Sequence, residues 1–208
     1  MRPSKLYPIT DRSLSGLSHA EQVARLVEGG ATFIQLREKL LGAREFYAEA
    51  EGALRAARAG GARLIINDRA DVALAVGADG VHLGQDDMPP EAARALLGAG
   101  AVIGFSTHNV GQAIAAARLP VDYIAVGPVF ETSSKERPDP VVGLEGLRRV
   151  REAVGGSVHL VAIGGVTREN AAAVLAAGAD SVAVISALLK RPAPDEITRL
   201  TRDFLAAL

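Results

Sequence analysis

Short apolar segments rich in strand-forming residues recur about eight times along the 208-residue chain, with helix-like segments rich in Ala, Leu, Glu and Arg between them. The apolar segments do not alternate with polar residues, which is typical of parallel strands covered on both faces. We predict strands at Leu6–Ile9, Phe33–Leu36, Leu64–Ile66, Gly80–Leu83, Val102–Gly104, Tyr123–Val126, His159–Ile163 and Ser181–Ile185. We predict helices at Ala20–Glu28, Ala43–Ala57, Pro90–Leu97, Val110–Ala117, Leu144–Val154, Arg168–Ala176 and Pro194–Leu208.

A short sequence repeat marks the junction between helix and strand. Gly77-Ala78-Asp79-Gly80-Val81 and Gly178-Ala179-Asp180-Ser181-Val182 share one form, in which the first glycine supplies a left-handed residue that ends a helix. Eight parallel strands joined by right-handed crossovers close into a barrel. The sequence therefore predicts an α/β protein, a single-domain (β/α)8 TIM barrel over residues 1–208, with an open doubly wound sheet as the alternative.

Composition excludes several classes of protein. Lys plus Arg number 23 and Asp plus Glu 24, so the net charge of −1 argues against a nucleic-acid partner. The chain has no Cys, which excludes disulfides and thiolate chemistry. The apolar stretch Ala171–Leu189 is interrupted by Asp180 and is better explained by a helix followed by a strand than by a membrane span. We expect a cytoplasmic protein with no membrane partner, and its oligomeric state is not revealed by periodicity.

Polar residues follow almost every predicted strand. They include Gln35, Arg37 and Lys39 after the second strand, Asn67 and Asp68 after the third, Asp87 after the fourth and Ser106 after the fifth. The strand starts are expected to carry no comparable polar set. Because active sites of this barrel lie at the carboxyl ends of the strands, this distribution predicts a catalytic site at one rim.

Asp68 and Asp87 follow neighbouring strands, and carboxylates of this kind suit Mg²⁺ completed by water and a substrate phosphate. Arg37, Lys39 and Lys135 on the same rim add the cations of a diphosphate pocket. The alternative is structural. Asp68 then caps a helix, and the cations at positions 37 and 39 pair with surface carboxylates of Glu38 or Asp79.

A second anion site is predicted at Gly164-Gly165, with Ile185-Ser186 after the last strand adding backbone N–H donors. The histidines are less informative. His19 is expected in a surface loop or at a helix start, His82 and His159 inside strands, and His108 on the rim. No Ser/His/Asp arrangement stands out, which disfavours hydrolysis by a nucleophilic serine.

Taken together, these residues resemble the thiamine-phosphate synthase family nearly from end to end. The motifs that carry the resemblance are Leu6-Tyr7, Ile9-Thr10-Asp11, Gln35-Leu36-Arg37-Glu38-Lys39, Ile66-Asn67-Asp68, Asp79 to Asp87, Gly104-Phe105-Ser106-Thr107-His108, Gly127-Pro128-Val129-Phe130, Lys135, Ile163-Gly164-Gly165-Val166 and Ile185-Ser186. The family is a (β/α)8 barrel that joins hydroxymethylpyrimidine diphosphate to a hydroxyethylthiazole phosphate, or its carboxylated form, giving thiamine phosphate and diphosphate.

The resemblance implies a role for each matching position. Gln35, Arg37, Lys39 and Asn67 would bind the pyrimidine diphosphate, which Ser106 and Lys135 would also contact, with Arg37, Lys39, Ser106 and Lys135 as the catalytic residues. Asp68 and Asp87 would hold Mg²⁺. Thr132, Ser133 and Ser134 would bind the carboxylate end of the thiazole, and Gly165, Ile185 and Ser186 its phosphate.

Three alternative functions stay open. A thiazole tautomerase shares this barrel and resembles the stretch from Val129 to Thr132, but it has a histidine where this chain has Pro128, and it lacks the two magnesium carboxylates. A non-catalytic paralogue would bind thiazole phosphate and act as a regulator. An unrelated phosphate-binding barrel is the third alternative.

Overall fold

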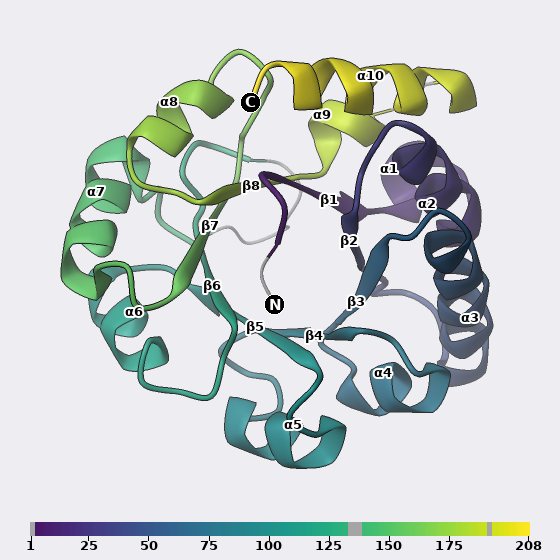
Figure 1. Cartoon of the computed structure of the whole chain (residues 1–208), viewed down its shortest axis with the longest axis horizontal. Coiled ribbons are helices and arrows are strands. Elements are labelled where there is room, and N and C mark those ends of the chain that lie inside the picture. The colour runs from purple at the N-terminus through teal and green to yellow at the C-terminus, as the bar shows by residue number, and fades with distance from the viewer. Residues whose placement is uncertain (1–2, 133–138, 191–192) are drawn as a thin grey trace.

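The computed structural model describes residues 3–132, 139–190 and 193–208, and its strands form one closed, all-parallel barrel in sequence order (Figure 1). The last strand pairs with the first, with Leu6 opposite Val182, so the open doubly wound sheet is excluded and the predicted (β/α)8 barrel is confirmed. The strands are Leu6–Thr10 (β1), Phe33–Leu36 (β2), Arg63–Asn67 (β3), Gly80–Leu83 (β4), Val102–Thr107 (β5), Tyr123–Val126 (β6), His159–Ile163 (β7) and Ser181–Val184 (β8).

Helices surround the barrel as an outer ring (Figure 1). They are Arg12–Ser15 (α1), His19–Glu28 (α2), Ala43–Ala59 (α3), Ala70–Val76 (α4), Pro90–Leu97 (α5), Val110–Ala116 (α6), Gly143–Val154 (α7), Ala171–Ala176 (α8), Ser186–Leu189 (α9) and Pro194–Ala206 (α10). All seven predicted helices are present, and the structure adds the short helices α1, α4 and α9. Residues 168–170 precede α8 rather than belonging to it, because the Asn170 side chain accepts a hydrogen bond from the Thr167 N–H.

The stretch from 171 to 189 is divided between α8, β8 and α9, as the central aspartate indicated. Among the described residues, no helix has the length and apolar character needed to cross a membrane.

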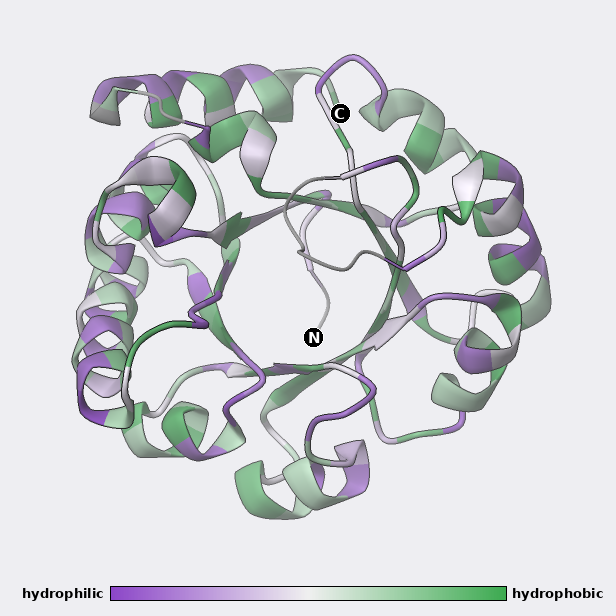
Figure 2. Ribbon diagram, turned by 180° about the vertical axis from the view of Figure 1, so that it is seen from behind, coloured by the Kyte–Doolittle hydropathy of each residue, from purple (hydrophilic) through white to green (hydrophobic). Residues whose placement is uncertain are grey.

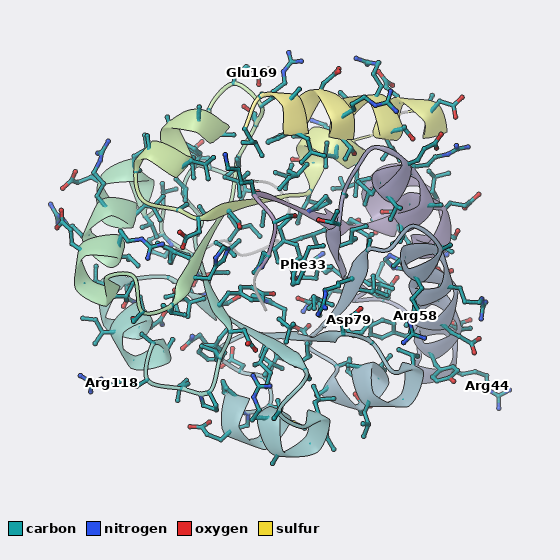
Figure 3. All side chains as sticks on the ribbon, in the orientation of Figure 1. Phe33, Arg44, Arg58, Asp79, Arg118 and Glu169 are labelled. Atoms are coloured by element: carbon teal, nitrogen blue, oxygen red, sulfur yellow. The ribbon has the colours of Figure 1, made fainter. Side chains whose placement is uncertain are left out.

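Apolar residues form two cores, one on each side of the barrel wall. Ile34 and Leu36 of β2 pack against the helices, whereas Phe33 lies inside the barrel (Figure 3). This two-sided burial is the physical reason for the continuously apolar strands. Figure 2 shows hydrophobic residues along the strands and hydrophilic residues over the outer turns of the helices, and Arg44 and Arg118 extend outward in Figure 3.

The strand starts do carry a polar set, contrary to expectation. Asp79, Asp122 and Asp180 each stand directly before a strand and accept a backbone N–H at 2.8–2.9 Å from the start of the preceding strand, donated by Leu64, Ile103 and Leu160 respectively. Each of these aspartates also donates its own N–H to the carbonyl of that same residue. The aspartate of the Gly-Ala-Asp repeat therefore closes the ladder at the amino end of paired strands, which is a structural role.

Replacing one of these aspartates is expected to destabilise the fold without touching the opposite rim. Asp122→Ala leaves the Ile103 N–H without its side-chain acceptor and removes the carboxylate that pairs with Arg94, so the free energy of unfolding falls by about 1–3 kcal/mol. Denaturant unfolding monitored by circular dichroism measures this change. The matched control is Asp203→Ala, whose carboxylate pairs with the exposed Arg199 on the outer surface of α10. An equal loss in both variants would contradict the assigned role.

Candidate active site

A cavity of about 1090 Å³ opens at the carboxyl ends of the strands. Every predicted site residue that the structure describes lines it, namely Gln35, Arg37, Lys39, Asn67, Asp68, Asp87, Ser106, Thr132, Gly165, Ile185 and Ser186. The predicted residues Ser133, Ser134 and Lys135 lie outside the described residues. Strand lengths differ slightly from prediction, because Asn67 still belongs to β3 and Ser106 to β5, so these side chains are held by the barrel wall.

Asp68 and Asp87 meet across the rim between β3 and β4. Their side chains lie within hydrogen-bonding reach of one another, and Asp87 Oδ2 accepts the Gly84 N–H at 2.6 Å. Burial raises the pKa of the Asp87 carboxyl above its ordinary value, and the neighbouring Asp68 carboxylate raises it further, against the opposing effects of the Gly84 N–H and Lys39. Two carboxylates held this close create a strong local preference for a cation.

Backbone geometry brings Asp68 into this position. Its φ of 63° places it in the left-handed region, which no other non-glycine residue adopts in the described part of the chain. The Asp68 N–H donates to the His82 carbonyl at 2.8 Å, so the turn after β3 is tied to β4. Aspartate tolerates this conformation better than most residues, at a cost of about 1 kcal/mol.

The carboxylate pair fits a divalent cation of the oxygen-preferring type. Mg²⁺ is usually bound through one or two protein carboxylates and completes its octahedron with water and substrate oxygens. Within the described ranges, no cluster of three or more His, Cys, Asp or Glu residues has metal-binding geometry. Asp68 and Asp87 are the residues that would hold such an ion.

The two rim cations have partners other than those of the structural alternative. Lys39 Nζ forms a short contact with Asp68 Oδ2, and Arg37 Nη1 donates to Asp11 Oδ2 at 3.2 Å. Pairing with Glu38 or Asp79 is therefore wrong for both. Helix α4 has no side-chain cap, so the suggested capping role of Asp68 is also wrong. Both cations line the cavity, where they would face an anionic ligand.

A buried histidine organises the loop that carries these cations. His19 is the first residue of α2, which confirms the predicted helix start. Its side chain is fully buried, so the predicted surface loop is wrong. The Arg37 N–H donates to Thr10 Oγ1, Thr10 Oγ1 lies 2.7 Å from His19 Nδ1, and His19 Nε2 lies 3.2 Å from Glu38 Oε2. Burial lowers the pKa of His19, although Glu38 acts in the opposite direction, so the ring is neutral and donates from Nε2.

Glu38 contacts His19 with one carboxylate oxygen and binds the backbone after β2 with the other. Its Oε1 accepts the backbone N–H groups of Lys39, Leu40 and Leu41 at 2.7, 2.6 and 3.3 Å. Burial alone would raise the pKa of Glu38, but hydrogen bonds from the Leu40 N–H, His19 and the Lys39 N–H hold it below its ordinary value. The carboxylate thus fixes the backbone on which Lys39 stands. Thr10 and His19 were not predicted as site residues, because their spacing from Glu38 gives no local signal.

The predicted second anion site lies on the same cavity. Gly164 and Gly165 have φ of 98° and 63°, and a Cβ on Gly165 would lie 2.6 Å from the Glu131 carbonyl oxygen. Only glycine fits this turn, which lines the cavity together with Ile185 and Ser186 at the start of α9.

A Ser/His/Asp set does occur, but at the wrong end of the barrel. His159 Nε2 lies 2.7 Å from Ser181 Oγ, and its Nδ1 lies 3.9 Å from Asp180 Oδ2. Ser181 has no exposed surface, and Asp180 already accepts from Arg151 and the Leu160 N–H. A substrate has no access to this serine, so the set is structural.

Several known proteins are similar to this chain over most of its length. A protein of Clostridium novyi named thiamine-phosphate synthase is 49% identical over 187 residues, covering 89% of this chain and 91% of its own. A protein of the same name from Chloroflexus aurantiacus is 46% identical over 203 residues, which cover 97% of this chain and 91% of that protein. A solved thiamine phosphate pyrophosphorylase from Pyrococcus furiosus superposes with a TM-score of 0.85 at 39% identity, covering 98% of this chain and 94% of its own.

A (β/α)8 barrel with its polar and ionisable side chains gathered in one cavity at the carboxyl ends of the strands defines a TIM-barrel enzyme. The family model described as thiamine monophosphate synthase matches residues 6–188. The chain belongs to the thiamine monophosphate synthase family and is a transferase of thiamine biosynthesis.

The buried His19 predicts a pH dependence of stability. Its folded pKa lies below its ordinary 6.5, so the unfolded chain binds more protons as the pH falls through 6.5. The contribution of the neutral ring is complete above that value and is lost on acidification, at up to about 1.4 kcal/mol per pH unit. Denaturant unfolding at several pH values should show a shallower acid loss for His19→Gln than for the wild type. His108→Gln on the rim is the control, and a wild-type slope in His19→Gln would refute the prediction.

Proposed function

We propose that this enzyme couples hydroxymethylpyrimidine diphosphate to a hydroxyethylthiazole phosphate, or its carboxylated form, releasing diphosphate and forming thiamine phosphate. The observation that carries the proposal is the contact between Asp68 and Asp87 in a cavity that also contains Arg37 and Lys39. A carboxylate pair beside cations is the donor set expected for a metal-bound diphosphate. The names of the relatives agree with this chemistry.

The residues around the diphosphate would act mainly by electrostatics. The bond from the benzylic-type carbon of the pyrimidine to the diphosphate breaks, and the neutral thiazole nitrogen forms a new bond at that carbon. Negative charge grows on the departing diphosphate, where Arg37 and Lys39 would neutralise it and Ser106 would donate a hydrogen bond. Lys135, outside the described residues, would add a further positive charge. No strong general base is required.

Mg²⁺ held by Asp68 and Asp87 would supply additional positive charge to the leaving diphosphate oxygens. The glycine turn at Gly164-Gly165 and the start of α9 would hold the thiazole phosphate, with Thr132, Ser133 and Ser134 at its carboxylate end. Water must also be kept from the carbon while it is electron-deficient, and the residues that line the cavity would help to exclude it.

Removing one metal carboxylate is expected to abolish most turnover while leaving the fold intact. Asp87→Asn retains the shape of the side chain but loses its charge, so kcat falls by about a hundredfold or more. Release of diphosphate and formation of thiamine phosphate from the two substrates with Mg²⁺ measure the effect. Asp86→Asn changes the adjacent, exposed carboxylate and serves as the matched control. Equal rates for Asp87→Asn and wild type would rule out the assigned metal site.

Chelation provides an independent test. Excess EDTA is expected to stop the coupling reaction, and added Mg²⁺ in excess of the chelator to restore it, because without the cation the two carboxylates repel the negatively charged diphosphate. Undiminished formation of thiamine phosphate in EDTA would contradict the proposal. The tautomerase and regulator alternatives predict no diphosphate release under any of these conditions.

A further inference from the structure

A continuous line of hydrogen bonds crosses the inside of the barrel. Gln35 Nε2 donates to the Tyr7 hydroxyl at 3.0 Å, and the Tyr7 and Tyr123 hydroxyls are 2.8 Å apart. The line continues from Tyr123 to His82 Nδ1 at 3.0 Å and from His82 Nε2 to Ser106 Oγ at 2.9 Å. We call these five residues the interior relay. Its two ends are Gln35 and Ser106, and four of its members, Gln35, Tyr7, His82 and Ser106, line the cavity.

The barrel leaves a specific space for the relay. Gly104 of β5 stands between His82 on β4 and Tyr123 on β6 in the strand register. A Cβ on Gly104 would lie 2.1 Å from Tyr123 Cζ and 2.6 Å from His82 Nδ1. Any other residue at 104 would therefore displace the central contact of the relay. Phe33 packs edge-on against Tyr7 with ring centroids 4.9 Å apart, so apolar contacts hold the tyrosines in place.

The hydrogen bonds can run in one direction that satisfies every member. Burial raises the pKa of both Tyr7 and Tyr123 far above the ordinary value, so each hydroxyl keeps one hydrogen to donate. Since the Tyr7 oxygen accepts from Gln35, its own hydrogen goes to Tyr123. The Tyr123 hydrogen then goes to His82 Nδ1, which must be unprotonated. The opposite order would leave the Tyr7 hydrogen without an acceptor in a fully buried place, which is costly.

This direction determines the state of Ser106. With Nδ1 unprotonated, the neutral His82 ring carries its hydrogen on Nε2 and donates it to Ser106 Oγ. The Ser106 oxygen is then occupied as an acceptor, and its own hydrogen is available to an acceptor in the cavity. An anion there meets a hydroxyl already oriented to donate, which avoids reorganisation during the reaction.

We propose that the interior relay presets Ser106 as a hydrogen-bond donor to the departing diphosphate, which makes Tyr7, Tyr123 and His82 positioning residues for the reaction. The consequence for catalysis rests on the proposed function, whereas the direction of the relay does not. The two parts are therefore tested by separate measurements.

The direction is read from the tautomer of His82. Nitrogen-15 NMR of the imidazole-labelled protein at neutral pH is expected to show hydrogen on Nε2 and none on Nδ1, with the signal assigned by its loss in His82→Gln. Tyr123→Phe removes the donor to Nδ1 and should abolish this preference. Phe33→Leu is the matched control, because it alters packing in the same layer without removing a hydroxyl, and it should keep the tautomer. Hydrogen on Nδ1 in the wild type would overturn the proposal.

The consequence is tested by a double-mutant cycle on the coupling reaction. Tyr123→Phe is expected to lower kcat by about tenfold, as for loss of one oriented hydrogen bond to a charged group. In a Ser106→Ala background the same substitution should cause no further loss, because it acts through that hydroxyl. Equal losses in both backgrounds would show a purely structural role and overturn the proposal. If no variant or wild type releases diphosphate, the proposed function fails while the tautomer result still decides the direction of the relay.

Discussion

Pairing of β8 with β1 is the constraint on which the rest of the molecule depends. Since every strand in the closed barrel runs in the same direction, the last residues of all eight strands meet at one mouth and the first residues at the other. The two ends of the barrel carry different kinds of side chain. Aspartates 79, 122 and 180 close the backbone ladder at the amino end, whereas the carboxyl end collects the ionisable side chains of the cavity. Stability and function are thereby separated in space.

Charged and polar side chains at the rim of the barrel hold the loop after β2 in position. Lys39 contacts Asp68, Arg37 contacts Asp11, and the neutral His19 donates to Glu38. These contacts favour one arrangement of the loop after β2. Under the proposed function, the Asp68 carboxylate would pair with a divalent cation and the Arg37 and Lys39 side chains would pair with a diphosphate. The loop is therefore held in one geometry by contacts made within the protein.

Most of the fold could be predicted because its signals are local. The apolar strands placed β2, β4, β6 and β7 with their final bounds, and the strand count gave the barrel. The prediction failed where long-range contacts extend or replace a local pattern. Strand β5 runs on to Thr107 because its partner β6 continues the ladder, with Ser106 opposite Ala125. The surface interpretation of His19 failed because a polar residue at a helix start gives no sign that Thr10 and Glu38 enclose it.

The sequence by itself determined which residue types stand at the rim, since side-chain direction and strand ends follow from periodicity and from short motifs. It placed all the described candidate residues on one cavity and indicated the family through them. Tertiary structure alone decided which of them touch. The contact of Asp68 with Asp87, the positive φ of Asp68 and the line from Gln35 to Ser106 depend on the register between strands distant along the chain. Periodicity fixes the face of a strand on which a side chain lies, but only the register and closure of the barrel bring two such faces together.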